Sequence, residues 1–266
     1  MHPDVLTLSA QRIAPLILLT YAVCISLEIV IAKLLNRKLY DFDDTLHNLI
    51  MFFANRMMGG LGGAFMFTVL SLAAQFVPWK LTGLVGNAVT FLIVDLLFYV
   101  QHRLFHTDSF LAPFHEVHHT SEHYNLTTTL RASVFLPFIN PLFYAPAVIL
   151  GCDPLAIIVA FSLIQVYQFF LHTQLIPALG PFEGLVNTPS AHRVHHGNEQ
   201  AQYESNLGGV LLIWDRLLGT YASEAADLVF GIKGVRQENN FFVAQVKPFV
   251  VYVRRLVKQM TNGVNG

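Results

Sequence analysis

The chain has 266 residues, of which 54% are hydrophobic and only 12% are charged, about half the charged share of an ordinary soluble domain. This composition, with 17 glycines and 2 cysteines, excludes a disordered chain, a collagen-like fibre and a disulfide scaffold. The formal net charge of -1 provides no general attraction for polyanions, so nucleic acid is not an expected partner.

Three apolar segments in the first half of the chain predict membrane-spanning helices. Residues 13–35 form the first, because about 20 residues of helix cross the hydrocarbon core of a bilayer. A polar connector, 36–45, precedes a second apolar stretch over 46–77, whose membrane part we expect at 59–77, with a glycine face for close helix packing. The third span, 84–101, leads directly into the first histidines.

The second half of the chain predicts a helical hairpin and a surface helix. Apolar segments at 134–150 and 155–173 are separated by only four residues, 151–154, so the second helix returns to the side that the first one left. Residues 246–260 predict a basic amphipathic helix that lies on a membrane or on the protein itself. We therefore expect one all-α membrane domain over 1–266, an integral helical bundle of about four to five apolar helices.

The distribution of lysine and arginine predicts the orientation. If the connector 36–45 is cytoplasmic, only Arg12 and Lys80 lie on the far side of the membrane, which agrees with the positive-inside rule. The same topology places every histidine cluster on the cytoplasmic side, as a histidine-rich helical cap on a multi-pass protein.

Histidine is unusually frequent, with 12 residues, and most of them fall into three motifs. Histidines at i, i+3 and i+4 share one face of a helix, as neighbouring metal ligands would. One such motif can be a polar helix face, but three in one apolar chain predict a metal site. The motifs are H-x-x-x-H at His102 and His106, H-x-x-H-H at His115, His118 and His119, and H-x-x-H-H at His192, His195 and His196.

The number of histidines indicates two metal ions. Neutral imidazole suits zinc, copper, iron and nickel, whereas magnesium and calcium prefer oxygen ligands. Eight ligands are too many for one ion, since a structural zinc takes four and a catalytic zinc three. Two metals with open positions suit the activation of a small molecule such as O₂, although the spacing alone does not distinguish iron from zinc or copper.

These motifs, on one side of several spans, resemble the fatty acid hydroxylase / sterol desaturase superfamily, over a region that covers residues 95–221. Within it, YNLTTTLR after the second motif and LGPFEGLVNTPS before the third are most similar to the alkylglycerol monooxygenase branch. The resemblance implies a membrane-bound enzyme with two iron ions that uses O₂ to hydroxylate or desaturate a C–H bond of a lipid, such as a sterol, a fatty acyl chain or an ether lipid.

The resemblance also implies which residues bind the metal. The family's ligands fall on the eight motif histidines, with His172 as a ninth. Gln168, one helical turn before His172, and Asp95, two turns before His102, are expected to hydrogen-bond near the ligands without binding metal. His123 lies outside the motifs and is predicted not to be a ligand.

The chain lacks a nucleotide-binding G-x-G-x-x-G motif and a cysteine cluster for iron and sulfur, so its electrons must come from an electron-donor protein or a diffusible reductant. Two alternatives stay open. A metal-binding or transport protein without catalysis would line a path with histidines inside the spans. A zinc-dependent hydrolase would need H-E-x-x-H, whereas His115-Glu116-Val117-His118 is one residue short of that spacing.

Overall fold

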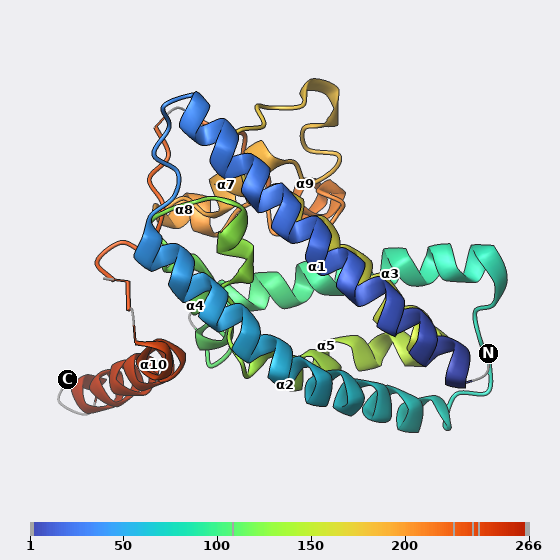
Figure 1. Cartoon of the computed structure of the whole chain (residues 1–266). Coiled ribbons are helices and arrows are strands. Elements are labelled where there is room, and N and C mark those ends of the chain that lie inside the picture. Colours follow the sequence, from blue (N-terminus) through green and yellow to red (C-terminus); the bar gives the residue numbers. More distant parts are fainter. Residues whose placement is uncertain (1–2, 108, 226, 236, 239, 264–266) are drawn as a thin grey trace.

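The structure, a computed structural model, describes residues 3–107, 109–225, 227–235, 237–238 and 240–263. The described part is helical and contains no β-strand (Figure 1). Its elements are α1 (Pro3–Leu34), α2 (Phe42–Ala74), α3 (Gly83–Phe105), α4 (Pro113–His119), η1 (Leu126–Leu130), α5 (Leu136–Ile149), α6 (Pro154–Leu171), η2 (Gly180–Phe182), α7 (Pro189–His195), α8 (Gln200–Tyr203), α9 (Ile213–Leu218) and α10 (Phe241–Gly263).

Four helices in the described part are long and apolar enough to cross a membrane: Ile13–Leu34 of α1, α2, α3 and α6. Helix α5 is apolar but has only 14 residues. This confirms the expected all-α bundle of four to five apolar helices. Only 6% of the most apolar window of α1 is buried within the protein, as expected for a helix whose sides contact lipid.

The second span begins earlier than the sequence suggested, because α2 is one continuous helix from Phe42. Asp41 caps it by accepting a hydrogen bond from the Asp44 backbone N–H at 3.0 Å. Three polar side chains of its first two turns, Asp44, His47 and Asn48, are buried in the protein, where Asn48 donates to Thr127 Oγ1 of η1 at 3.1 Å. Residues 42–45, which were expected in the connector, are therefore helical. The polar first turns of α2 bind η1 through the hydrogen bond of Asn48.

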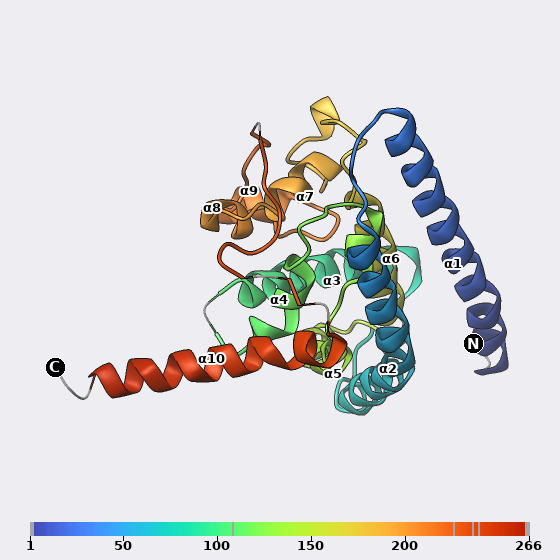
Figure 2. The same ribbon diagram turned by 60° about the vertical axis from the view of Figure 1, so that its left-hand side comes forward.

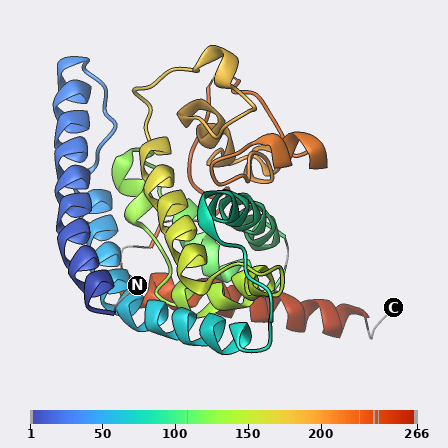
Figure 3. The ribbon, with the colours of Figure 1, turned by 90° about the vertical axis from the view of Figure 1, so that its right-hand side faces the viewer.

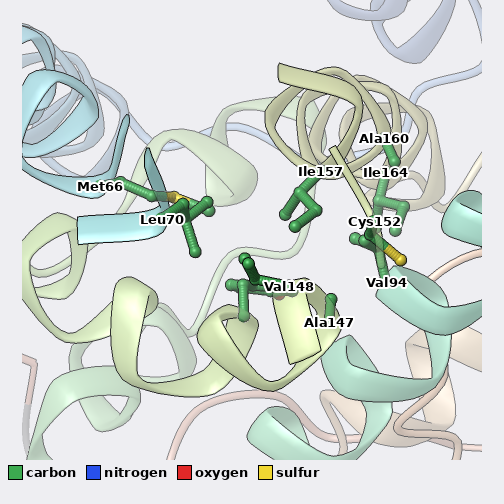
Figure 4. Packing of buried hydrophobic residues seen from close by; sticks show 10 residues of the cluster. Met66, Leu70, Val94, Ala147, Val148, Cys152, Ile157, Ala160 and Ile164 are labelled. Atoms are coloured by element: carbon green, nitrogen blue, oxygen red, sulfur yellow. The ribbon is translucent and has the colours of Figure 1, made fainter. Parts of the chain in front are cut away.

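The core of the bundle lies where α2, α3, α5 and α6 meet. Helix α2 packs along α5 and α3 along α6, and the α5–α6 connection is the short hairpin turn that the sequence predicted. Figure 4 shows Leu70, Val148 and Ile157, from three of these helices, directed into a shared apolar space; each is at most 1% exposed. Because these apolar contacts hold the helices together, the ends of α3 and α6 can carry the polar histidines.

Helix α1 lies at the outer edge of the bundle (Figures 2 and 3) and is connected to it through one buried carboxylate. Glu28 is only 3% exposed and accepts hydrogen bonds from the Tyr40 hydroxyl, the Leu126 backbone N–H and the Thr173 hydroxyl. A carboxyl group is unfavourable within an apolar helix, and here the Glu28 carboxyl group joins α1 to the segments after α4 and α6.

One glycine of the predicted small-residue face makes a close helix contact. A Cβ atom at Gly62 would lie 2.2 Å from the Pro137 Cβ atom of α5, whereas one at Gly63 would meet nothing within 4 Å. We expect Gly62→Ala to destabilise the protein by about 1–3 kcal/mol through overpacking. The control Gly63→Ala should be neutral or slightly stabilising, because alanine favours the helix. Thermal unfolding of both variants in detergent checks this, and equal stability would contradict the contact.

The short helices α4, α7 and α8 gather beside the end of α3 (Figure 1). Helix α10 confirms the expected amphipathic helix and is longer than predicted. It packs against α4 and α2 with its first half, and its second half extends away from the body (Figure 2).

Candidate metal centre

The nine predicted histidines come from four helices whose ends converge. His102 lies in the last turn of α3 and His106 follows its end, while His172 follows the end of α6. Helices α4 and α7 are short, and each begins with a proline in its first turn, which fixes where the helix starts. Each therefore presents its H-x-x-H-H motif on one face, as the i, i+3 and i+4 spacing required.

The structure brings all nine side chains together in two adjacent groups. Within each group, one nitrogen of every ring lies within 4.8 Å of one nitrogen of every other ring. The imidazole rings of His119 and His196, one from each group, are stacked with centroids 4.3 Å apart, so the groups are contiguous. The first group is His102, His106, His115, His119 and His195, and the second is His118, His172, His192 and His196.

Backbone carbonyls fix the tautomer of four of these rings. Each ring places Nδ1 within 3.0 Å of a carbonyl oxygen, and a carbonyl only accepts, so Nδ1 carries the proton. The remaining nitrogen, Nε2, then holds a lone pair that points into the group. The pairs are His102 with Leu207, His118 with Arg131, His172 with Gln168 and His195 with Ser205.

Two of these lone pairs face each other. The Nε2 atoms of His118 and His172 are 3.1 Å apart, and neither carries a proton, because Nδ1 of each ring donates to a carbonyl. Neutral rings cannot hydrogen-bond in this arrangement, and their lone pairs repel. Two nitrogens bound at right angles to a metal at about 2.1 Å would be about 3.0 Å apart, so a shared cation accounts for this geometry.

Burial keeps the histidines in the neutral form that binds metals. It lowers the pKa of His115 and His195 well below the usual range, with a smaller contribution from neighbouring histidines. It also lowers the pKa of His118, to about 4, against the stabilising effect of the Arg131 carbonyl. Protons therefore compete with metal ions only under strongly acidic conditions.

These lowered pKa values predict how the stability of the metal-free protein depends on pH. The unfolded chain binds protons on histidine below a pKa of about 6.5, whereas the folded chain does not until about pH 4 at His118. Stability should therefore be complete above about pH 6.5 and fall between about pH 6.5 and 4. Thermal unfolding of chelator-treated protein across this range measures it, and a flat profile would show that the rings are not buried as described.

Asp95 lies two helical turns before His102 in α3, and its hydrogen bonds go to a loop beside the site rather than to a histidine. It accepts hydrogen bonds from the backbone N–H groups of Val210 and Leu211 and from Trp214 Nε1, at 2.7, 3.2 and 2.9 Å. The loop it holds supplies the Leu207 carbonyl that orients His102. Asp95 thus acts on the site through this loop, because a side chain two turns before His102 is too far along α3 to reach its ring.

Gln168 lies between the second group and the same loop. Its Nε2 donates to the Gly209 carbonyl at 2.5 Å, and its own backbone carbonyl accepts from His172 Nδ1 at 2.7 Å. It therefore supports a ligand position through the backbone, a contact that side-chain spacing does not predict. His123 belongs to neither group, as predicted.

The loop after α8 is held by a second carboxylate. Asp215 is fully buried and accepts hydrogen bonds from the backbone N–H groups of Leu207 and Gly208 and from the Thr220 hydroxyl. The next residue, Arg216, donates a hydrogen bond to the Glu183 carbonyl. The loop that supplies the Leu207 carbonyl to His102 is thus built around Asp215, whose burial is compensated by three donors.

Three further residues support the site and were missing from the sequence prediction. The ring of Tyr203 packs on His106 with centroids 4.1 Å apart, and that of Tyr124 on His196 at 5.0 Å. Arg131 is fully buried and donates to the Val117 carbonyl within α4. Tyr124 and Arg131 lie in the YNLTTTLR segment, whereas Tyr203 lies in none of the motifs, and the contacts of all three arise from tertiary packing.

A narrow cleft runs from the histidines into the bundle between α3, α5 and α6. It consists of two cavities of about 90 and 70 Å³, whose linings share Phe98, His102, His115, Leu136 and Gln165. Its walls are mostly apolar, so it suits a hydrocarbon chain placed next to a metal centre.

Comparison with known proteins identifies relatives with lipid chemistry. The family model described as fatty acid hydroxylase matches residues 87–220. The alkylglycerol monooxygenase of Danio rerio is 43% identical over 145 residues, 54% of this chain and 32% of that protein, and the one of Homo sapiens is 42% identical over 143 residues, 53% and 32%. The ornithine lipid hydroxylase of Rhizobium tropici is 27% identical over 223 residues, 78% of this chain and 66% of that protein.

The chain thus spans about a third of the length of the alkylglycerol monooxygenases that it matches. No solved structure matches it.

Proposed function

The chain belongs to the fatty acid hydroxylase family, and on that premise we propose that it is a membrane-bound oxidoreductase whose two histidine groups hold two iron ions and use O₂ to oxidise a lipid C–H bond. Hydroxylation is the reaction that the names of its relatives support, and desaturation is the alternative outcome of the same chemistry.

One observation carries the proposal. The facing lone pairs of His118 and His172, in a buried group of four histidines beside a group of five, are accounted for by a cation bound between them. Nitrogen ligands of this kind select iron, zinc, copper or nickel. The family relationship favours iron, and neither group contains the carboxylate of an H-E-x-x-H hydrolase.

In the proposed reaction, a C–H bond, O₂, two electrons and two protons give an alcohol and water. Bound iron would supply the oxygen activation. The histidines would hold the two ions. The carbonyls of residues such as Leu207 and Ser205 keep Nε2 free for them, and the apolar cleft would place the lipid chain beside His102 and His115 and exclude water.

The orientation and the electron source are part of the proposal. The basic residues of the connector 36–45 and of α10 favour a histidine centre on the cytoplasmic side. An electron-donor protein or a diffusible reductant would then deliver electrons there. The lipid substrate would enter from the bilayer between α3, α5 and α6.

The test measures metal content and oxygen transfer in the same sample. Protein purified in detergent and loaded with ferrous iron should hold about two irons per chain, and with a chemical reductant it should transfer isotopically labelled oxygen from O₂ to a lipid extract. The matched control is the same protein loaded with zinc, which cannot change its oxidation state. Stoichiometric zinc in the protein as isolated, with no O₂ consumed on any lipid after iron loading, would reject the proposal.

A further inference from the structure

The cleft beside the histidines contains polar groups that metal binding does not use. Gln101, near the end of α3, and Asn140, in the second turn of α5, line its inner end, the smaller of the two cavities. Polar side chains within membrane-spanning bundles are costly and therefore point to a role in binding. Gln165, on α6, lines both cavities of the cleft.

The hydrogen bonds at the inner end run in one direction. The Tyr144 hydroxyl donates to Gln101 Oε1 at 2.9 Å, and Gln101 Nε2 donates to Asn140 Oδ1 at 2.8 Å. The side-chain oxygen Oδ1 of Asn140 thereby accepts a hydrogen bond, and the Nδ2 group of Asn140 is the last donor of this series. Within the described residues, that Nδ2 group donates to no protein atom, so the chain presents an N–H donor at the cleft.

Gln165, on α6, adds a second amide to the lining of the cleft. It shares one face of α6 with Gln168 and His172, three and seven residues later. Gln168 is bonded to the Gly209 carbonyl, but the part of the chain that the structure describes provides no partner for the Gln165 amide, which is exposed in the cleft. The two amides therefore lie in one apolar cleft whose lining includes His102 and His115.

We propose that Asn140 and Gln165 bind an oxygen atom of the lipid substrate. The substrate is then a lipid with an ether, ester or hydroxyl oxygen close to the carbon that is oxidised, and a plain hydrocarbon chain is a poor ligand. Phe105 and Phe161 on the cleft wall contact the adjoining methylene groups. This inference rests on the proposed function and specifies its substrate class.

The experiment measures binding without turnover. Iron-loaded protein in detergent, kept free of O₂, is offered a long-chain glyceryl ether and an alkane of equal length, and native mass spectrometry gives the ratio of the two complexes. The variants are Gln165→Leu, which changes a residue exposed in the cleft, and Asn140→Leu. The matched control is Asn87→Leu, an exposed amide on α3 that lines a separate cavity.

The parent protein should prefer the ether lipid, and each cleft variant should lose about fivefold to tenfold of that preference, the contribution of one hydrogen bond. Iron content and alkane binding should stay unchanged, and the control should keep the full preference. Equal preference in the parent and in both cleft variants, or an equal loss of both ligands, would overturn the inference. A parent that selects the ether lipid but oxidises none would overturn the proposed function and leave this binding site in place.

Discussion

Replacing His118 or His195 with alanine is expected to abolish lipid oxidation and to remove iron from the chain. The two residues belong to different groups, and each presents an Nε2 lone pair fixed by a carbonyl, the Arg131 carbonyl for His118 and the Ser205 carbonyl for His195. Losses beyond about a hundredfold in activity are expected, because even the residues that only support metal ligands contribute 10–100-fold. Iron analysis of the purified variants and a turnover assay measure both effects.

Membrane insertion should not change, since the four long apolar helices are unaffected. His123→Ala is the matched control, because this histidine follows the same motif but lies outside both groups. It should keep its iron and most of its activity. Turnover at the parent rate in either ligand variant would remove that residue from the metal centre.

Breaking the buried ion pair between Arg131 and Asp44 is expected to have the largest effect on the stability of the protein. Arg131 is fully buried and Asp44 is 1% exposed, with Nη1 and Oδ1 3.5 Å apart. In Arg131→Met the Asp44 charge stays buried without its partner, which costs about 3–5 kcal/mol. The variant also loses the bond to the Val117 carbonyl within α4, so iron should be retained more weakly. Thermal unfolding in detergent and iron release to a chelator measure the two consequences.

Two further variants separate charge burial from the loss of a side chain. The double variant Asp44→Asn with Arg131→Met should recover part of the lost stability, because the unpaired charge is gone. Lys233→Met removes an ion pair with Glu199 whose side chains are 71% and 59% exposed, and it should cost less than about 1 kcal/mol. Equal losses in Arg131→Met and Lys233→Met would show that the buried pair is not formed.

The sequence predicted the features that depend on local pattern. Apolar length defined the spans, and the short connector 151–154 predicted the α5–α6 hairpin. The i, i+3, i+4 spacing of the histidines identified the residues that meet, because a motif on one helical face needs no tertiary information. His172, isolated in sequence, was placed only by family resemblance, and the structure brings it beside His118.

The groups that orient the ligands could not be predicted in the same way. Four of the hydrogen-bond partners are backbone carbonyls, such as that of Leu207, and a carbonyl has no signature in a sequence. Asp95 was recognised as an unusual carboxylate, but its partners, like those of Asp215, lie in the segment 207–220, whose path depends on the whole fold. Similarly, the polar first turns of α2 are buried because Arg131, far along the chain, bonds to Asn48 and pairs with Asp44.

The all-imidazole composition of the two groups has an electrostatic consequence. Two divalent cations would be surrounded by nine uncharged rings, and no aspartate or glutamate belongs to either group in the described chain. Their charge would have to be neutralised by small anions drawn from solution, so hydroxide is the natural counterion and azide or cyanide the natural inhibitors. If the ions are iron, as proposed, a neutral protein environment would also disfavour the additional positive charge of the ferric state, which would raise the reduction potential and let a weak donor reduce the centre.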